Sequence, residues 1–157
     1  MPNWSITTSL NQTPSRIFAL LCQPLQRLKL TPPEWNLRVK SGPAILLPGS
    51  RVAYQGKRWG LSLNMEVEVV EYQTDSILTE NQIRGPFPHW LHQHHLQPNP
   101  DGSTSLVETI TYEAPKGLLG QLLNQDRIEK DLEALYRWRE PIIRELVLAS
   151  ITDLSQR

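Results

Sequence analysis

The feature that most constrains this chain is a change of hydrophobic period along it. Residues 60–72, GLSLNMEVEVVEY, place apolar side chains at alternate positions from Leu61 to Val69, with Ser, Asn and Glu between them. A period of two is typical of an antiparallel strand that buries one face and leaves the other in water. Similar strands are predicted at 3–10, 34–41, 51–55, 76–83, 88–97 and 103–113.

Beyond Pro115 the period becomes helical. Apolar residues begin at Leu118 and then recur every three or four positions as far as Val147, which predicts one long amphipathic C-terminal helix. Pro141 lies inside it, and its missing N–H and its ring are expected to kink or restart the helix near Glu140.

Two short helices are predicted directly after the first strand. Thr13 is a good N-cap and Pro14 fits the first helical position, so a helix should cover 13–23. Pro24 opens a second short helix over 24–30, which ends before Pro32 and Pro33. Both are too short to be the crossovers of a large parallel sheet.

This order of elements predicts an α+β fold in which a curved antiparallel sheet wraps around the long C-terminal helix. An antiparallel sheet must bury its apolar face, and only that helix is large enough to cover it. Because one helix is narrower than a sheet of many strands, a gap should remain between them, and an internal gap is the usual form of a small-molecule site. We expect a single domain over 1–154 and a short tail at 155–157.

Composition excludes several classes of protein. The 157 residues carry a formal net charge of zero, which disfavours a nucleic-acid partner that needs a basic surplus. The single cysteine, Cys22, cannot form an internal disulfide, and its apolar setting indicates a buried thiol. No signal peptide and no transmembrane segment is recognisable, so we expect a cytoplasmic protein.

All four histidines occur in PHWLHQHHL, residues 88–96. Strand alternation places His92 and His94 on the face of Trp90 and His89 and His95 on the other. Counting back across the turn at 99–102 places His94 opposite residue 107 or 108, and the second choice makes Glu108 its partner. This face is the more apolar one, so we expect it to point towards the helix.

Three interpretations of His92, His94 and Glu108 remain open. They can form a buried hydrogen-bonded group that only fixes the sheet. They can provide polar contacts to a mostly apolar ligand. They can also form a metal or acid–base site, although a metal would need a third and preferably a fourth ligand. We predict no cofactor and no metal.

Other side chains are candidates for the cavity. Trp35, Tyr54, Met65, Trp90 and Tyr112 are candidate walls, and for each the alternative is plain hydrophobic core, which is physically the same environment without a ligand. Gln82 is a candidate polar group near the bend at GPF, where its facing is unpredictable.

The central third of the chain resembles the START/Bet v 1-like (SRPBCC) superfamily, in its ligand-binding or polyketide cyclase/dehydrase-like branch. The pattern expected there is Q-x-x-GPF-x-x-W-x-H-x-H-x-F, a Gly-Thr turn, a D-x-x-x-Y strand and P-x-G-x-x-G. The matching residues are Gln82, Gly85, Pro86, Phe87, Trp90, His92, His94, Tyr112, Pro115, Gly117 and Gly120. Leu96 replaces the aromatic residue, Glu108 replaces the aspartate, and the turn is one residue longer.

This resemblance implies a helix-grip fold and a pocket rather than a particular reaction. It points to a hydrophobic or amphipathic ligand such as a lipid, a quinone or a polyketide-like compound, and more to a ligand-binding protein than to an enzyme. The alternative is a cyclase or dehydratase in which His92, His94 or Glu108 moves a proton. A third possibility is a delivery protein that hands its ligand to a partner.

Overall fold

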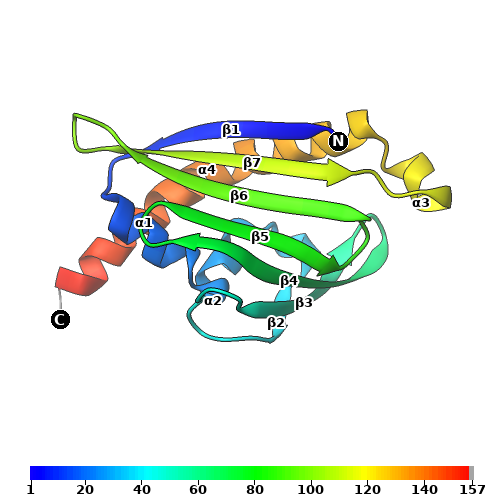
Figure 1. The fold of residues 1–157 in the computed structure, drawn as a ribbon, viewed down its shortest axis with the longest axis horizontal. Helices are drawn as coiled ribbons and strands as arrows, with labels where there is room; N and C mark the ends of the chain where they lie inside the picture. Colours follow the sequence, from blue (N-terminus) through cyan, green and yellow to red (C-terminus); the bar gives the residue numbers. More distant parts are fainter. Residues whose placement is uncertain (156–157) are drawn as a thin grey trace.

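Seven antiparallel strands form one sheet in the computed structural model, which describes the backbone of residues 1–155 and the side chains of 1–149 (Figure 1). The spatial order is β1-β7-β6-β5-β4-β3-β2, so strands β2 to β7 form a meander and β1 closes its far side against β7. The strands are β1 (Asn3–Leu10), β2 (Arg38–Ser41), β3 (Arg51–Arg58), β4 (Leu61–Gln73), β5 (Ile77–Arg84), β6 (His89–Pro98) and β7 (Thr104–Glu113).

The predicted helices after the first strand are present. In α1 (Pro14–Leu21) the Thr13 side chain accepts a hydrogen bond from the backbone N–H of Arg16, at 3.4 Å, which caps the helix as its sequence predicts. Pro24 begins α2 (Pro24–Arg27), and η1 (Leu28–Leu30), a short 3₁₀ turn, continues it. Ile17, Leu21 and Leu30 are buried, so this end of the molecule is closed by apolar side chains.

The prediction of a strand over 34–41 is wrong in its first half. Pro33–Trp35 form a second 3₁₀ turn, η2, and Asn36 adopts a left-handed conformation with φ of 47°, so β2 begins only at Arg38. The alternating apolar and polar residues from Trp35 onwards therefore belong to a turn followed by a short strand, and not to one continuous strand. Asn tolerates the left-handed region better than most residues, which explains why the chain can change direction there.

The long strand β4 carries two register shifts against β5, one between Glu66 and Val67 and one between Val69 and Glu71. Such irregularities bend a strand and increase its twist, which lets the sheet curve around the helix that it covers. The predicted facing is kept along most of β4, where Leu63 and Val69 are buried, but Leu61 at its start is half exposed.

The long helix α4 (Gln125–Ser155) crosses one face of the sheet from the side of α3 (Gly117–Leu122) to the side of α1 (Figure 1). Leu118 was expected to begin it, but α3 is a separate helix that ends at Leu122. Pro141 was expected to kink or restart α4, and the helix does not restart there but continues through it. The boundary at 154 stays a prediction, and residues 156 and 157 of the expected tail lie outside the described residues.

The hydrophobic core has two parts. One contains Leu106 of β7 and Ile143 and Val147 of α4, and the other contains Ile110 of β7 and Leu132 of α4. Between them, along both elements, lie Glu108 and Arg139, which are buried although charged. A polar layer therefore divides the apolar interior.

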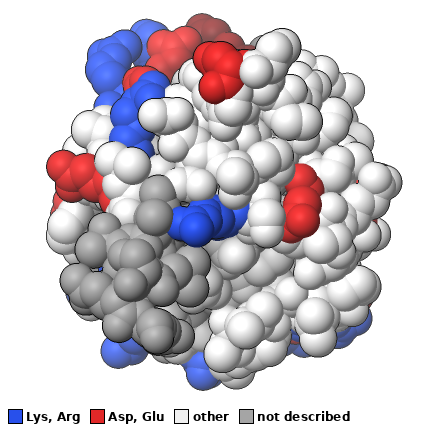
Figure 2. Space-filling view, turned by 90° about the vertical axis from the view of Figure 1, so that its left-hand side faces the viewer, with Lys and Arg blue, Asp and Glu red and all other residues white. Residues whose placement is uncertain are grey.

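Among the described residues, no helix is both long enough and apolar enough to cross a membrane. On the end of the molecule near α1, acidic and basic side chains are scattered among uncharged residues, and neither sign of charge gathers there (Figure 2).

Candidate functional site

The polar layer is built around Glu108 of β7. Its side chain is 1% exposed, and Arg139 of α4 donates from Nη2 to both carboxylate oxygens, at 3.2 and 3.3 Å. The Tyr136 hydroxyl donates to Oε1 at 3.0 Å, and His92 Nε2 lies 3.0 Å from the same oxygen. Burial alone would raise the pKa of Glu108, but the charge of Arg139 and the hydrogen bond from His92 outweigh it and hold the pKa below its ordinary value. Glu108 is therefore ionised, with most of its hydrogen bonds accepted by Oε1.

His94 lies directly opposite Glu108 in the β6–β7 register, as one of the two predicted registers required. Its Nδ1 is 3.1 Å from the carbonyl oxygen of Leu78, and because a carbonyl only accepts, Nδ1 carries the proton. Its Nε2 is 3.4 Å from Glu108 Oε1. Burial, followed by the charges of His92 and Arg27, lowers the pKa of His94 to about 3, so the ring is neutral near pH 7.

A second buried ion pair lies beside the first. Arg27, the last residue of α2, donates to Glu80 of β5 from both terminal guanidinium nitrogens, from Nη1 to Oε1 and from Nη2 to Oε2 at 2.8 Å. Burial opposes ionisation of Glu80, but the charge and the hydrogen bonds of Arg27 lower its pKa to about 2. Each buried carboxylate thus has its own arginine.

A pocket of about 200 Å³ lies between the sheet and α4. Its walls come from the 27–37 segment, from β3 to β7 and from α4. The apolar wall contains Leu28, Leu30, Leu37, Leu63, Met65, Val67, Ile110, Leu132 and Leu135. The polar wall includes Arg27, Tyr54, Glu80, Gln82, His92, Tyr136 and Arg139. The polar layer described above therefore forms one side of an otherwise apolar pocket.

The predicted site residues fall into two groups. Those that line the pocket are Trp35, Tyr54, Met65, Gln82, Trp90 and His92. His94, Glu108 and Tyr112 do not line it. They are fully buried on the inward face of the sheet, outside the pocket lining. Strand alternation in β6 and β7 directs these side chains inward. The Tyr112 hydroxyl donates instead to Glu129 of α4, at 3.2 Å.

Gln82 has a structural role that sequence alone did not define. Its side-chain amide donates to the carbonyl oxygen of Phe87, at 2.7 Å, and so closes the bend that begins at Gly85. A Cβ atom at Gly85 would lie 2.3 Å from Gln82 Oε1, so a larger residue there would displace the Gln82 amide. The GPF bend and Gln82 form one unit beside the pocket.

Aromatic rings form the side of the pocket near the β3–β4 turn. Trp59 contacts Phe87, Phe87 contacts Trp90, and Trp90 contacts Tyr112, with ring centroids 6.2, 4.6 and 5.9 Å apart. The Arg58 guanidinium lies between the rings of Trp35 and Trp59. Such rings provide large apolar surfaces with little conformational freedom.

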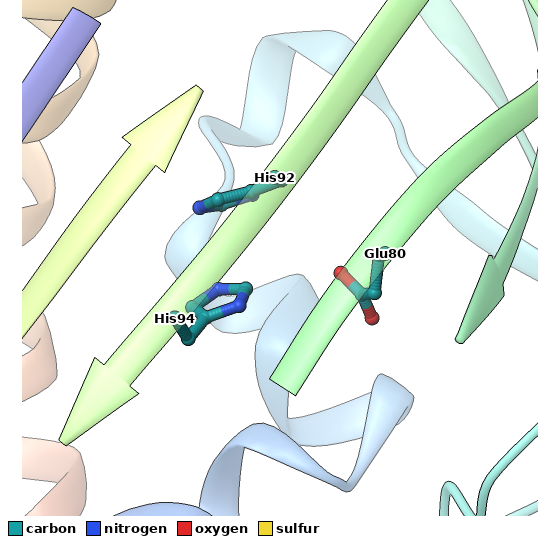
Figure 3. Close-up of side chains that lie close together, drawn as sticks. All are labelled: Glu80, His92 and His94. Atoms are coloured by element: carbon teal, nitrogen blue, oxygen red, sulfur yellow. The ribbon is translucent and has the colours of Figure 1, made fainter. Parts of the chain in front are cut away.

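One oxygen or nitrogen from each of Glu80, His92 and His94 lies within 4.8 Å of the others, a grouping that can be tested as a metal site (Figure 3). Figure 3 shows the three side chains on the same face of β5 and β6. The surrounding charges argue against a divalent cation. Both oxygens of Glu80 already bind Arg27, and Arg139 neutralises Glu108. A metal ion would add two positive charges to a buried layer in which the carboxylates and arginines already balance.

Sequence analysis missed Arg27, Glu80, Tyr136 and Arg139. Glu80 shares strand parity with buried Leu78, and Arg139 falls on the helical spacing of Leu132, Tyr136 and Ile143, so a charged residue on an apolar stripe was the available signal. Arg27 gave no comparable signal, because it ends a very short helix.

Comparisons with known proteins agree with this architecture. No protein-family model matches the chain, and no curated protein matches it in sequence. A solved structure of a Thermus thermophilus protein is similar to it at 22% identity and a TM-score of 0.67, over 95% of this chain and 99% of that one. Ara h 8.0201 is similar at 12% identity and a TM-score of 0.65, over 94% and 98%. Major latex-like protein 151 of Panax ginseng is similar at 15% identity and 0.55, over 85% and 95%.

The chain therefore has the helix-grip fold of the START/Bet v 1-like (SRPBCC) superfamily, as its motifs predict. At these identities the likeness concerns the fold, and function must be argued from the site.

Proposed function

We propose that this protein binds a hydrophobic or amphipathic small molecule, such as a lipid, a quinone or a polyketide-like compound, between its sheet and α4. The observation that carries the proposal is a pocket whose walls are mostly aliphatic and aromatic, with a few polar groups held on one side. This distribution is typical of small-molecule sites, in which apolar walls provide affinity and a few polar groups fix the orientation.

The size of the pocket limits the ligand. About 200 Å³ is below the roughly 300–1,000 Å³ that is typical of pockets for drug-sized ligands. A small ligand fits as the walls stand. A longer one must extend through the mouth of the pocket or displace adaptable side chains such as Met65.

The polar side of the pocket is better suited to holding the polar part of a ligand than to donating a proton to it. Glu108 and Glu80 are each bound to an arginine, so neither carboxylate is available as a proton donor near neutral pH. His92 is the polar-layer histidine that lines the pocket, and its Nε2 is held by Glu108. Its ring is therefore positioned to contact the polar part of a ligand.

Mass spectrometry of the intact protein under native conditions, before and after organic extraction, tests this proposal together with a panel of fatty acids and quinones. The variant Met65→Trp should fill the pocket and reduce binding. Its control, Val70→Trp, places the same ring on the exposed side of the same strand and should bind as the wild type does. Absence of any releasable ligand and of binding across the panel would refute the proposal.

A second candidate is a cyclase or dehydratase acting on a polyketide-like substrate. The observation that favours it is His92, which lines the pocket and is oriented by a carboxylate, an arrangement suited to proton transfer. An enzyme requires turnover that is lost in His92→Ala while ligand binding persists in part. If no bound compound is turned over, the enzyme candidate is rejected and ligand binding remains as the proposed function. The cytoplasmic location and the delivery role remain predictions.

A further inference from the structure

Arg58 occupies an unusual position at the mouth of the pocket. It is the last residue of β3, and its guanidinium carbon lies 3.8 Å from the centroid of the Trp35 ring and 4.2 Å from that of Trp59. Trp35, Arg58 and Trp59 line both the internal pocket and a shallow depression on the surface beside Gly60. These three residues therefore stand at the boundary between the pocket and solvent.

Arg58 differs from the other pocket arginines in its charge balance. Arg27 and Arg139 each bind a buried carboxylate, whereas no carboxylate oxygen in the described part of the chain lies within 4.0 Å of Arg58. Asp131 stabilises its charge from farther away, but the oxygens of Asp131 bind Trp59 Nε1 at 3.1 Å and Arg127 Nε at 3.0 Å. Burial lowers the pKa of Arg58 to about 10, which leaves it cationic at pH 7. Arg58 thus has no direct ion pair among the described residues.

The backbone that positions the Trp59 ring has an unfavourable conformation. Trp59 and Gly60 form the two-residue turn between β3 and β4 with φ of 53° and 71°, and this left-handed region is unfavourable for a bulky residue such as tryptophan. The Trp59 indole is also fixed by Asp131. Strain of this kind persists where the surrounding structure maintains it, and it occurs preferentially at ligand sites.

The chemistry of the guanidinium indicates which kind of ligand group would bind Arg58. The donors of a guanidinium lie along its planar edges, and such an edge binds a carboxylate through two parallel hydrogen bonds. A carboxylate carries one negative charge, which matches the single charge of Arg58, whereas a phosphate monoester carries about two charges near neutral pH.

We propose that Arg58 binds the carboxylate head group of an amphipathic ligand whose apolar part enters the pocket. This inference rests on the proposed function and narrows it from amphipathic molecules in general to hydrophobic monocarboxylic acids. The head group lies at the mouth beside the Arg58 guanidinium, and the alkyl chain of the ligand extends towards Leu63 and Leu132.

Binding of decanoate, 1-decanol and decyl phosphate at pH 7, measured by calorimetry, tests the inference. The wild type should bind decanoate about 10- to 100-fold more tightly than decanol, and decanoate binding should weaken as salt is raised. Arg58→Gln should remove that preference, because it should weaken the binding of decanoate much more than the binding of decanol. Arg51→Gln, an exposed arginine at the other end of β3, should change neither.

Three outcomes would overturn the inference. Equal binding of decanoate and decanol by the wild type would show that no carboxylate is recognised, and this measurement requires no folded variant. Tighter binding of decyl phosphate than of decanoate would assign a dianionic head group. Failure of all three probes to bind would count against the proposed function itself. Circular dichroism of Arg58→Gln confirms that any loss is not caused by unfolding.

Discussion

Arg139 of α4 donates two hydrogen bonds to Glu108 of β7, and both side chains are buried between the two parts of the hydrophobic core. This contact joins the long helix to the centre of the sheet. It also places opposite charges where either one alone would be costly.

Replacing Glu108 with Gln should therefore destabilise the fold strongly. The amide keeps the shape but leaves the charge of Arg139 buried without a counter-ion, which typically costs about 3–5 kcal/mol. Urea denaturation followed by tryptophan fluorescence measures the change. The control is Glu68→Gln, which breaks the exposed pair with Arg51 and should cost less than about 1 kcal/mol. Equal effects of the two substitutions would show that burial of the pair is unimportant.

Stability should fall between pH 7.5 and pH 5 because of His94. In the unfolded chain this ring takes up a proton near its ordinary pKa of 6.5, but in the folded protein its pKa is about 3, so protons favour unfolding as the pH falls below 6.5. At pH 5 the loss is about 2 kcal/mol, at about 1.4 kcal/mol per unit. Glu80, with a pKa of about 2, adds a further loss only below pH 4.5.

The comparison of wild type with His94→Gln over that pH range isolates the effect. The variant should be less stable at pH 7.5 but should lose less stability on acidification, because it has no imidazole to protonate. Unfolding midpoints in urea at the two pH values provide the measurement. Identical pH dependence in the two proteins would assign the acid sensitivity to other groups.

Pro141 should be replaceable with a gain in stability. It is exposed within a continuous helix, and as proline it lacks the N–H that would bond one turn back. Pro141→Ala should raise the free energy of unfolding by about 1–3 kcal/mol, measured by thermal or urea denaturation. Glu133→Ala, at another exposed position of α4, should change it by less than about 0.5 kcal/mol. Destabilisation by Pro141→Ala would mean that the packing of α4 depends on a local bend.

Gly56→Ala should disturb the mouth of the pocket. An added Cβ would lie 2.7 Å from the carbonyl oxygen of Trp35 and 2.9 Å from Leu37 Cδ1, so the 3₁₀ segment η2 would have to move away from β3. Overpacking of this kind typically costs about 1–3 kcal/mol. We expect a lower unfolding midpoint and altered tryptophan emission. Lys57→Ala, at the exposed neighbouring position, should leave both unchanged.

Local signals predicted much of this fold. The Thr13 cap and the helix after it follow from residues that contact one another within a few positions. The turn at Asn99–Gly102, where Gly102 N–H donates to Asn99 O at 3.1 Å, placed His94 opposite residue 107 or 108, and the structure selects Glu108. Strand alternation then assigned the inward face correctly, because one side of β6 and β7 is consistently more apolar.

The remaining parts depend on contacts between distant segments. Arg27 and Glu80 are 53 residues apart, and no pattern within either segment reveals the other. Trp35 was assigned to a strand because its neighbours alternate by chance, whereas the prolines before it and Asn36 after it determine a turn. The distinction between pocket wall and buried core at His92 and His94 depends on where α4 leaves space, which strand periodicity does not encode.

The division of the core by Glu108 and Arg139 has a consequence for the position of α4 along the sheet. Aliphatic contacts alone would tolerate a shift of the helix by one turn, since Leu and Ile side chains can substitute for one another. Such a shift would place the guanidinium beside an aliphatic residue of β7, Leu106 or Ile110, and leave the carboxylate without its partner. The ion pair thereby selects a single alignment of helix and strand, and with it a single shape for the space between them.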